Sequence, residues 1–224
     1  MGLPTVKDIG IHVARWAATL EGEEVPKLEF LDAMQRRRLS ALARATLSVI
    51  WRVVEPGVQL PMIFASEHGE IVSTHRMLSA IARQEAVSPT AFSHSVHNAL
   101  AGQASILRHD PSPVRSIAAG LDSLPCAVLE ASMLLAQGAP QVLLVAADEE
   151  VPEPWRRFVK TERPYALAAV LTAGEPTVWL SQVAAGEASR REPGSARGLL
   201  AVLQGTSAAQ VEGERGDWSW RTAA

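Results

Sequence analysis

The segment best placed to present a reactive side chain is SIAAGLDS, which runs from Ser116 to Ser123. Its pattern predicts the end of a short strand, a tight turn at Ala119-Gly120 and a helix whose N-cap is Asp122. A thiol at such an elbow lies beside the positive end of the helix dipole, which favours the nucleophilic thiolate. The residue between the turn and the cap is Leu121, which offers no nucleophile. By residue type alone, Leu121 is also an ordinary core leucine at a turn.

Two other groups of residues suggest chemistry, and each has a simpler structural reading. Cys126 could be a displaced nucleophile, but it lies in a very apolar predicted helix, where a thiol stays protonated and inert. His94 and His97, with Ser93 and Ser95 nearby, could indicate serine hydrolysis or a metal site. The chain has neither G-x-S-x-G nor H-E-x-x-H, so a polar interface loop is the better interpretation.

Acidic and glycine-rich motifs give no cofactor site. The run Asp148-Glu149-Glu150 follows a predicted buried strand, and without an oxygen-rich loop around it we expect an exposed acidic turn rather than a metal site. Neither G-x-G-x-x-G nor G-x-x-x-x-G-K-[ST] occurs, which argues against nucleotide binding. We therefore expect no cofactor and no metal.

Composition sets broad limits on function. The 224 residues, 47% hydrophobic and 20% charged, are typical of a well-packed globular chain. A net charge of −3 argues against binding to nucleic acid or to a membrane surface. The single cysteine excludes an internal disulfide and fits a reducing compartment. With no signal-peptide pattern and no apolar run of about 20 residues, we expect a soluble cytoplasmic protein.

Short apolar runs alternate with amphipathic stretches, which indicates strands alternating with helices. The predicted strands are Ile9–Ala18, Gln59–Ser66, Val114–Ala118, Gln141–Ala147, Pro164–Ala173 and Thr177–Val183, and the predicted helices are Arg38–Val54, Gly69–Arg83, Asn98–His109, Ser123–Gln137 and Ser195–Leu203. This pattern predicts an α/β fold with one mixed, mainly parallel sheet flanked by helices, whose last two strands form a hairpin through Gly174-Glu175-Pro176. We expect residues 1–184 to be the folded unit and 185–224 to be a linker and C-terminal tail.

The predicted helix from Ser123 to Gln137 is apolar on nearly all sides, with Glu130 and Gln137 almost its only strongly polar members. A helix of this kind must be covered on all sides, and one sheet covers one face only. Either the segment after Ala185 covers the other face, or another chain does. The sequence thus gives a physical reason to expect a partner.

Three segments together resemble the β-ketoacyl synthases, condensing enzymes of the thiolase-like fold. VSPTAFSHSVHNALAG (Val87–Gly102) looks like the SP…F…S…N…AG stretch of those enzymes, and SIAAGLDS matches the strand and elbow that carry their active-site cysteine. MLLAQGAPQVLLVAAD (Met133–Asp148) matches the helix end and strand that follow. The resemblance implies the N-terminal half of a thiolase-like fold. Counting without gaps from Ala101-Gly102 places the synthase cysteine at Leu121.

Two departures from the synthase pattern imply that the chain is not an enzyme on its own. A leucine cannot form the thioester on which a synthase depends. Synthases also take two histidines from the second half of a duplicated fold, and this chain has about half the length of a full enzyme. All its histidines precede the elbow: His12, His68, His75, His94, His97 and His109.

The chain most resembles chain-length factors, which lack the cysteine, pair with an active synthase and shape its acyl tunnel. More narrowly, it is similar to the short subunits of this type in bacterial aryl polyene clusters, and MIFASEHGE (Met62–Glu70) adds to that likeness. The resemblance implies a heterodimer with a full-length β-ketoacyl synthase in aryl polyene, polyketide or fatty-acid-type biosynthesis. It implies interface and tunnel roles for Ala91, Phe92, Ser95, Asn98, Gly102, Val114 and Ser116, with bulky Phe92 helping to set chain length.

Basic residues suggest transient docking of an acyl carrier protein, an acidic partner, on Arg156, Arg157 and Lys160; a similar run lies at Arg36–Arg38. Short basic runs are also common on solvated helix faces. Two other functions stay open from the sequence. One is a reduced acyltransferase or hydrolase that uses Cys126 or a serine, and the other is a homodimeric carrier-protein docking module.

Overall fold

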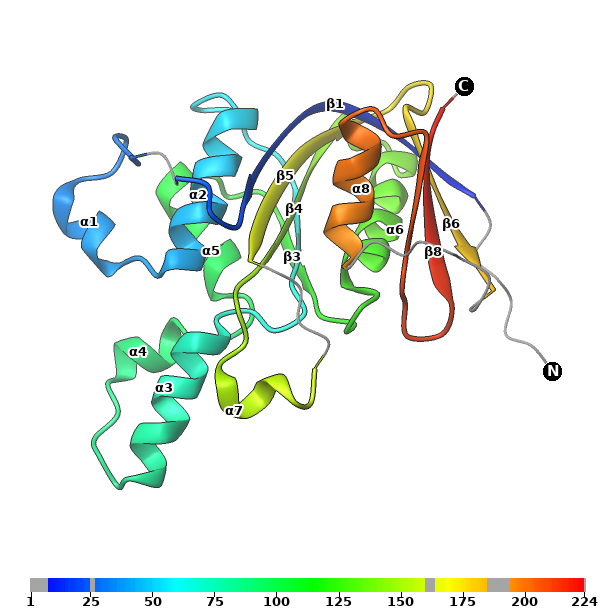
Figure 1. The fold of residues 1–224 in the computed structure, drawn as a ribbon. Coiled ribbons are helices and arrows are strands. Elements are labelled where there is room, and N and C mark those ends of the chain that lie inside the picture. Colours follow the sequence, from blue (N-terminus) through cyan, green and yellow to red (C-terminus); the bar gives the residue numbers. More distant parts are fainter. Residues whose placement is uncertain (1–7, 25–26, 160–163, 185–193, 224) are drawn as a thin grey trace.

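The alternating pattern of the sequence produces one sheet with helices on both faces. In a computed structural model, the structure describes residues 8–24, 27–159, 164–184 and 194–223. The sheet has eight strands in the order β3-β2-β4-β5-β1-β6-β8-β7 (Figure 1). The strands are β1 (Ile9–Leu20), β2 (Met62–Ala65), β3 (Val114–Ile117), β4 (Gln141–Asp148), β5 (Tyr165–Thr172), β6 (Val178–Val183), β7 (Ala208–Val211) and β8 (Asp217–Thr222). The helices are α1 (Ala33–Arg38), α2 (Ala41–Val53), α3 (Ile71–Ala82), α4 (Pro89–Ser93), α5 (Ala99–Arg108), α6 (Ser123–Ala136), α7 (Glu153–Arg156) and α8 (Ser195–Leu203).

The prediction of a mixed sheet flanked by helices is confirmed, but the prediction that it is mainly parallel is wrong. Only β2 pairs in parallel, with β3 on one side and β4 on the other. The other pairings in the described sheet are antiparallel, namely β4–β5, β5–β1, β1–β6, β6–β8 and β8–β7. The described part of the connection from β4 to β5 holds only the four-residue α7 and no helix that crosses back over the sheet, so β5 runs antiparallel to β4.

The expected hairpin between the strands around Gly174–Pro176 does not form. β1 lies between β5 and β6 and pairs with both, through His12–Leu20 on one side and Ile9–Ile11 on the other. The chain between β5 and β6 instead crosses β1 near its start, where the Thr177 amide donates to the Ile11 carbonyl at 2.8 Å. A local turn signal cannot reveal a strand inserted from the other end of the chain.

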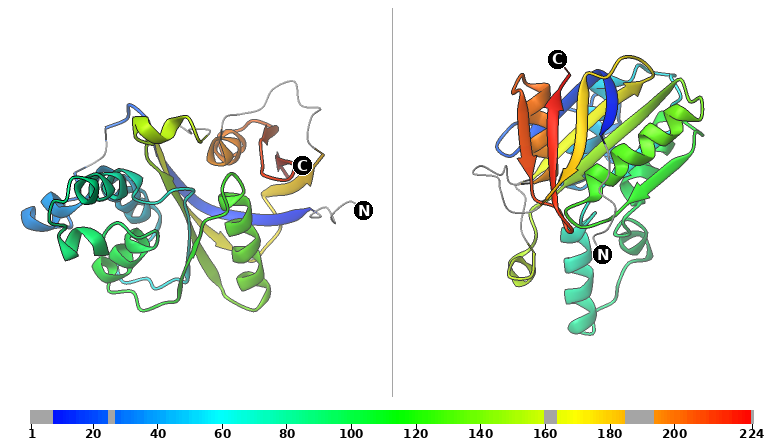
Figure 2. Two further views of the ribbon diagram at one scale, coloured as in Figure 1. Left: turned by 90° about the horizontal axis from the view of Figure 1, so that it is seen from below. Right: turned by 90° about the vertical axis from the view of Figure 1, so that its right-hand side faces the viewer.

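Two helical layers sandwich the sheet (Figure 2). On one face, α2 and α5 pack through Leu47, Val49 and Leu100, among others, and on the other face α6 and α8 pack through Leu124, Val128 and Leu199. α6 packs on β2, β3 and β4, and α5 packs on β3. These contacts position the elbow between β3 and α6. Among the described residues, no helix is long and apolar enough to span a membrane.

The segment expected to be a linker and tail is part of the fold, so the boundary at residue 184 does not separate a folded unit from a tail. α8, β7 and β8 continue the sheet beyond β6, and Trp220 of β8 is completely buried. A side chain on Gly198 of α8 would lie 2.7 Å from the Trp220 ring, so glycine allows α8 to approach the hairpin closely. The stretch proposed as a linker, 185–193, lies outside the described residues.

The C-terminal segment covers a second side of α6, which is one of the two alternatives that the sequence left open. α8 packs beside it in the same core, with Leu199 and Leu200 buried. The cover is incomplete, because Leu129 and Met133 on α6 remain 41% and 50% exposed. The C-terminal segment therefore covers part of α6, and the apolar surface at Leu129 and Met133 is left for a partner to cover.

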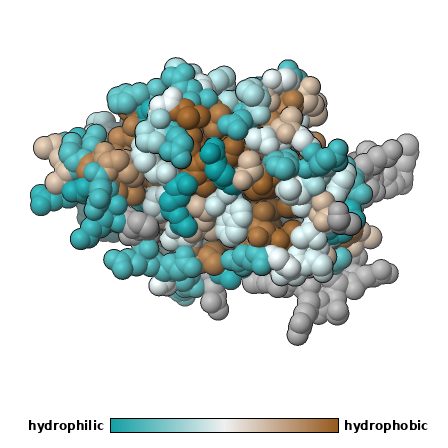
Figure 3. All heavy atoms as spheres, turned by 90° about the horizontal axis from the view of Figure 1, so that it is seen from above, coloured by the Kyte–Doolittle hydropathy of each residue, from teal (hydrophilic) through white to brown (hydrophobic). Residues whose placement is uncertain are grey.

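α3 and α4 project from the body of the molecule as an arm (residues 71–93), at the lower left of Figure 1. Neither helix contains a buried residue. Leu78, Ile81 and Phe92 on this arm are 45%, 55% and 58% exposed. Hydrophobic side chains also gather in the middle of the face shown in Figure 3, inside a mostly hydrophilic surface.

Candidate functional site at the elbow

The elbow after β3 has the geometry that the sequence predicts. Gly120 adopts a φ of +57°, a left-handed conformation that favours glycine, and the chain then enters α6 at Ser123. The Ser123 hydroxyl donates to the Gly120 carbonyl at 2.7 Å and accepts from the Ala119 amide at 2.9 Å. Leu121 therefore lies at a tightly fixed turn at the start of a long helix.

A carboxylate from the C-terminal hairpin occupies this turn. The Leu121 amide donates to Glu214 Oε1 at 3.0 Å. Asp122 begins α6 as predicted, but its side chain does not cap the helix. Instead, Asp122 Oδ1 accepts from the Glu214 amide at 3.1 Å and from Trp218 Nε1 at 2.8 Å, so the hairpin and the elbow hold each other in place.

A second carboxylate organises the neighbouring strand ends. Asp148, at the end of β4, accepts from the Ser66 hydroxyl at 2.6 Å and from the amides of Glu67 and His68 at about 3 Å. Tyr165 also donates its hydroxyl to Asp148 at 3.2 Å. The expectation of an exposed acidic turn is therefore wrong for Asp148, which is 9% exposed and ties β4 to the turn after β2. Burial raises the pKa of Asp148 despite these donors.

Two glutamates beside Asp148 have pKa values close to neutral pH. Burial raises the pKa of Glu67 to about 7, and the nearby carboxylates of Asp148 and Glu214 add to the shift. Burial likewise raises the pKa of Glu149 to about 7, although its carboxylate accepts from the Val72 amide at the start of α3. Because Glu214 reaches Leu121, this acidic cluster extends to the elbow. Such surroundings oppose a thiolate, which needs positive charge nearby.

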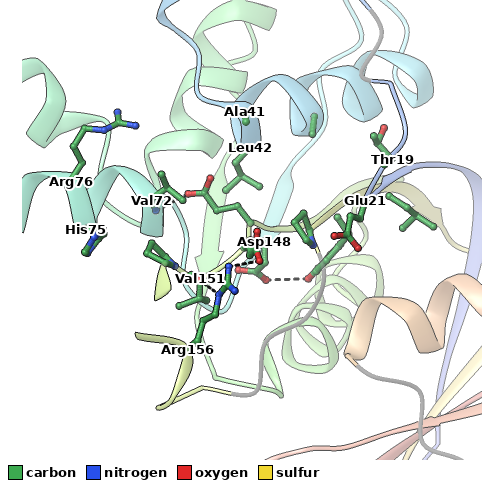
Figure 4. Close-up of a pocket in the computed structure, with 18 of the residues that line it drawn as sticks. Thr19, Glu21, Ala41, Leu42, Val72, His75, Arg76, Asp148, Val151 and Arg156 are labelled. Atoms are coloured by element: carbon green, nitrogen blue, oxygen red, sulfur yellow. Dashed lines mark hydrogen bonds and ion pairs between the residues drawn. The ribbon is translucent and has the colours of Figure 1, made fainter. Parts of the chain in front are cut away.

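A cavity of about 900 Å³ lies next to the cluster, between the end of β1, α2, α3 and the segment after β4 (Figure 4). Its walls carry both signs of charge, with Asp148 and Glu149 on one part and Arg76 and Arg156 on others. Leu121 is not among its lining residues. The cavity therefore does not open onto the elbow.

The other reactive groups have structural partners. Burial raises the pKa of the partly buried Cys126 thiol, and Asp122 raises it further, so the thiol is protonated near neutral pH. His97 Nε2 lies 2.8 Å from the Ser66 carbonyl, and Ser93 donates its hydroxyl to the Pro89 carbonyl. No group of three or more His, Cys, Asp or Glu residues in the described part of the chain is arranged to hold a metal ion.

The predicted interface residues on β3 and α5 lie at one edge of the sheet. β3 pairs only with β2 within the described sheet, and Val114 on it is 36% exposed. The Ser116 hydroxyl is buried and makes no hydrogen bond within the described chain. A side chain on Gly102 of α5 would meet no atom within 4 Å, so this helix surface is open.

The predicted tunnel residues near α4 divide into two groups. Ala91, Phe92 and Asn98 are exposed and accessible to another molecule. Ser95 faces inward: it is 9% exposed and donates its hydroxyl to the Phe92 carbonyl at 2.8 Å. Ser95 therefore positions Phe92 rather than lining a surface itself.

The predicted docking residues for a carrier protein are not equivalent. Arg156 pairs with Glu150 and Glu153 and donates to the Val151 carbonyl, so its charge is largely balanced within its own turn. Arg157 is exposed, with its guanidinium 4.7 Å from the centre of the Phe158 ring. Lys160 lies outside the described residues.

Comparison with known proteins identifies the family. The sequence model of the β-ketoacyl synthase N-terminal domain matches residues 13–221, nearly the whole chain. This chain belongs to that family. The match runs past residue 184 and therefore includes the C-terminal segment that completes the sheet.

Solved structures confirm the thiolase-like ketosynthase fold. The chain is similar to a chain of the ketosynthase (ApeO) in complex with its chain length factor (ApeC) from Xenorhabdus doucetiae, with a TM-score of 0.81 and 25% identity over 95% of this chain and 99% of that chain. The ishigamide ketosynthase/chain length factor matches with a TM-score of 0.51 and 17% identity over 71% of this chain and 52% of that chain. A β-ketoacyl synthase from Burkholderia phymatum STM815 matches with a TM-score of 0.56 and 10% identity over 76% and 54%. No curated protein matches the sequence.

Sequence reasoning missed the role of Glu214 and the burial of Asp148. Glu214 is 93 positions from Leu121 in the chain, and nothing local links them. Asp148 left a partial signal, because an acid that directly follows a fully apolar strand is well placed to end up buried. The sequence shows that the nucleophile position holds a leucine. The structure shows in addition that this position has acidic surroundings, which would disfavour a thiolate.

The two glutamate pKa values of about 7 predict that the free energy of unfolding falls as the pH rises. In the folded chain Glu67 and Glu149 have a pKa of about 7, above the ~4.3 of an unfolded chain. Their contribution is present in full below about pH 4.3 and is lost as the pH rises through about 7. Burial lowers the pKa of His68, which opposes this trend, and raises the pKa values of Asp148 and Glu70, which add to it.

We therefore expect the free energy of unfolding, measured in urea, to be lower at pH 8 than at pH 6. Glu149→Gln should raise it at pH 8 by roughly 1 kcal/mol after allowance for solvent screening, and should flatten the pH profile. Glu55→Gln, at an exposed position, is the control. A profile that rises from pH 6 to pH 8 would show that these glutamates are charged in the folded chain.

A cysteine placed at the elbow should be unreactive. In Leu121→Cys, made in a Cys126→Ala background, the new thiol lies beside Glu214, so we expect a pKa above the ~8.5 of free cysteine. Adding Glu214→Gln should lower that pKa while keeping a hydrogen-bond acceptor for the Leu121 amide. The rate of iodoacetamide alkylation against pH measures both. Alkylation of Leu121→Cys at pH 7 faster than that of free cysteine would contradict this description of the elbow.

Proposed function

We propose that this chain is a non-catalytic, chain-length-factor-like subunit that pairs with a full-length β-ketoacyl synthase and shapes its acyl tunnel. The observation that carries the proposal is the elbow, where Leu121 replaces a nucleophile and its amide is bound by Glu214. The reaction would be condensation in aryl polyene, polyketide or fatty-acid-type biosynthesis, in the cytoplasm. The synthase would supply the cysteine and both histidines.

The similarity to solved complexes supports this pairing. The matched chain of the Xenorhabdus complex is covered over 99% of its length, whereas this chain spans only 52–54% of the two other matched chains. That complex therefore contains a chain of about the same size as this one, and its two named components are a ketosynthase and its chain length factor. We infer that this chain has the second of these roles.

The edge at β3 is the surface that we assign to the synthase. An edge strand exposes unpaired amides and carbonyls, which another strand can bind. α5 and α6 both pack against β3, and they carry the exposed side chains Ile106, Leu129 and Met133, which are 73%, 41% and 50% exposed. An edge strand and exposed apolar side chains on the helices that pack on it are both features of protein interfaces.

The arm would contribute to the tunnel. Phe92 is 58% exposed, and the inward hydrogen bond from Ser95 holds the backbone on which it sits. A large rigid ring held in this way could close the end of a partner's acyl channel and so limit product length. An acyl carrier protein would contact the complex transiently, with Arg157 as the predicted docking residue on this chain that is both described and free of a balancing ion pair.

Co-expression with a full-length β-ketoacyl synthase, followed by size-exclusion chromatography with light scattering, tests the pairing. We expect a one-to-one complex. Ile106→Glu and Leu129→Glu should each weaken it by roughly tenfold or more, because each buries a charge in an apolar interface. Met34→Glu on α1, at a site 64% exposed, is the matched control and should leave the complex intact.

Two outcomes would contradict the proposal. One is a stable monodisperse monomer that forms no complex with any synthase tested. The other is a homodimer that persists in the presence of the synthase and is lost with Ile106→Glu, since this would assign the same surface to a second copy of the chain.

A further inference from the structure

A second, cationic cavity lies on the α1–α2 side of the molecule. It has a volume of about 560 Å³, within the range of small-molecule sites, and is lined by Lys27, Leu28, Ala33, Arg36, Arg37, Ala41 and Arg44. Four of these seven residues are cationic and none is acidic. The whole chain carries a net charge of −3, so this concentration of positive charge is a local feature.

The loop and helix that form the cavity are held in place by contacts within the described chain in which Arg36 is the one lining cation involved. Arg36 is the anchor, because its guanidinium donates to the carbonyls of Leu28 and Leu31 at 3.1 and 2.6 Å. Asp32 and Gln35 form a reciprocal capping box at the start of α1. Phe30, in the same loop, stacks on Trp51 of α2 with ring centroids 4.0 Å apart. The loop is therefore held against α2 before any ligand binds.

The remaining cations face the cavity without partners. Lys27, Arg37 and Arg44 make no hydrogen bond or ion pair through their side chains within the described chain. They come from three different segments, namely the loop before α1, the end of α1 and the first turn of α2. Like charges that converge in this way repel each other, and an anion bound between them would offset the repulsion.

A purely structural explanation covers only some of these residues. Basic side chains at the end of α1 interact favourably with its C-terminal carbonyls, which accounts for Arg36, Arg37 and Arg38. It does not account for Arg44, which lies at the positive end of α2, where a cation is unfavourable unless an anion is also present. Arg44 thus points to a ligand rather than to helix stability.

We propose that this cavity binds a phosphate monoester with an apolar organic part. Guanidinium groups bind phosphate oxygens in a bidentate manner, and the N-terminus of α2 adds partial positive charge. Ala33 and Ala41 are exposed and supply apolar surface for the organic part. The ester is either a soluble phosphate monoester or a lipid with a phosphate monoester headgroup. The site does not depend on pairing with a synthase.

Isothermal titration calorimetry of the full chain with 1-naphthyl phosphate, at fixed near-physiological ionic strength, tests the proposal. We expect one saturable site, and weaker binding of inorganic phosphate and of 1-naphthol. Arg37→Gln and Arg44→Gln should each weaken binding by roughly tenfold or more. Arg38→Gln is the matched control, because it removes the same charge from the same helix turn but Arg38 does not line the cavity.

Flotation with vesicles that contain phosphatidic acid separates the two sources of the ester. Binding of the vesicles that is lost in Arg44→Gln assigns the lipid, and binding of naphthyl phosphate alone assigns the soluble ester. Lys27→Gln, in an exposed loop, gives an independent test if an arginine variant fails to fold. The proposal is overturned if no probe saturates, if 1-naphthol binds as well as its phosphate, or if Arg38→Gln weakens binding as much as Arg37→Gln.

Discussion

The apolar helix α6 must be covered on two sides, and much of the molecule is organised by that requirement. The sheet covers one side through Leu124, Ala127 and Val128. α8 covers another side, and Trp220 of β8 is completely buried against α8. The C-terminal segment of described residues 194–223 therefore completes the hydrophobic core on this face of the sheet.

The same hairpin determines the chemistry of the elbow. Once β8 pairs with β6, the loop that enters it lies against the start of α6, where Asp122 binds Trp218 and Glu214 binds the Leu121 amide. The same C-terminal segment therefore covers α6 and binds the backbone at the nucleophile position. The Glu214 carboxylate lies at the Leu121 amide, where an activated thiolate would need positive charge, so the elbow lacks both a nucleophile and the electrostatic field that would activate one.

Local patterns in the sequence predicted the parts of this structure that local physics decides. The amphipathic faces of α2 and α5, the apolar β4 and the turn at Gly120 all follow from residue type and spacing. Pairings between distant segments were not predictable in this way, and they include β1 between β5 and β6, Glu214 on Leu121, and Asp148 beneath the turn after β2. For the functional site, the missing nucleophile was readable from one residue, whereas the acidic surroundings required the folded chain.

The proposed function depends most on the β3 edge being the surface where a synthase binds. Hydrogen–deuterium exchange of the backbone amides, measured with and without a full-length β-ketoacyl synthase, tests that claim directly. We expect new protection in 114–117 and in the neighbouring parts of α5 and α6, with no change in α1 or in β7 at the opposite edge of the sheet. Protection at β7 or α1, with residues 114–117 exchanging as fast as in the free chain, would contradict it.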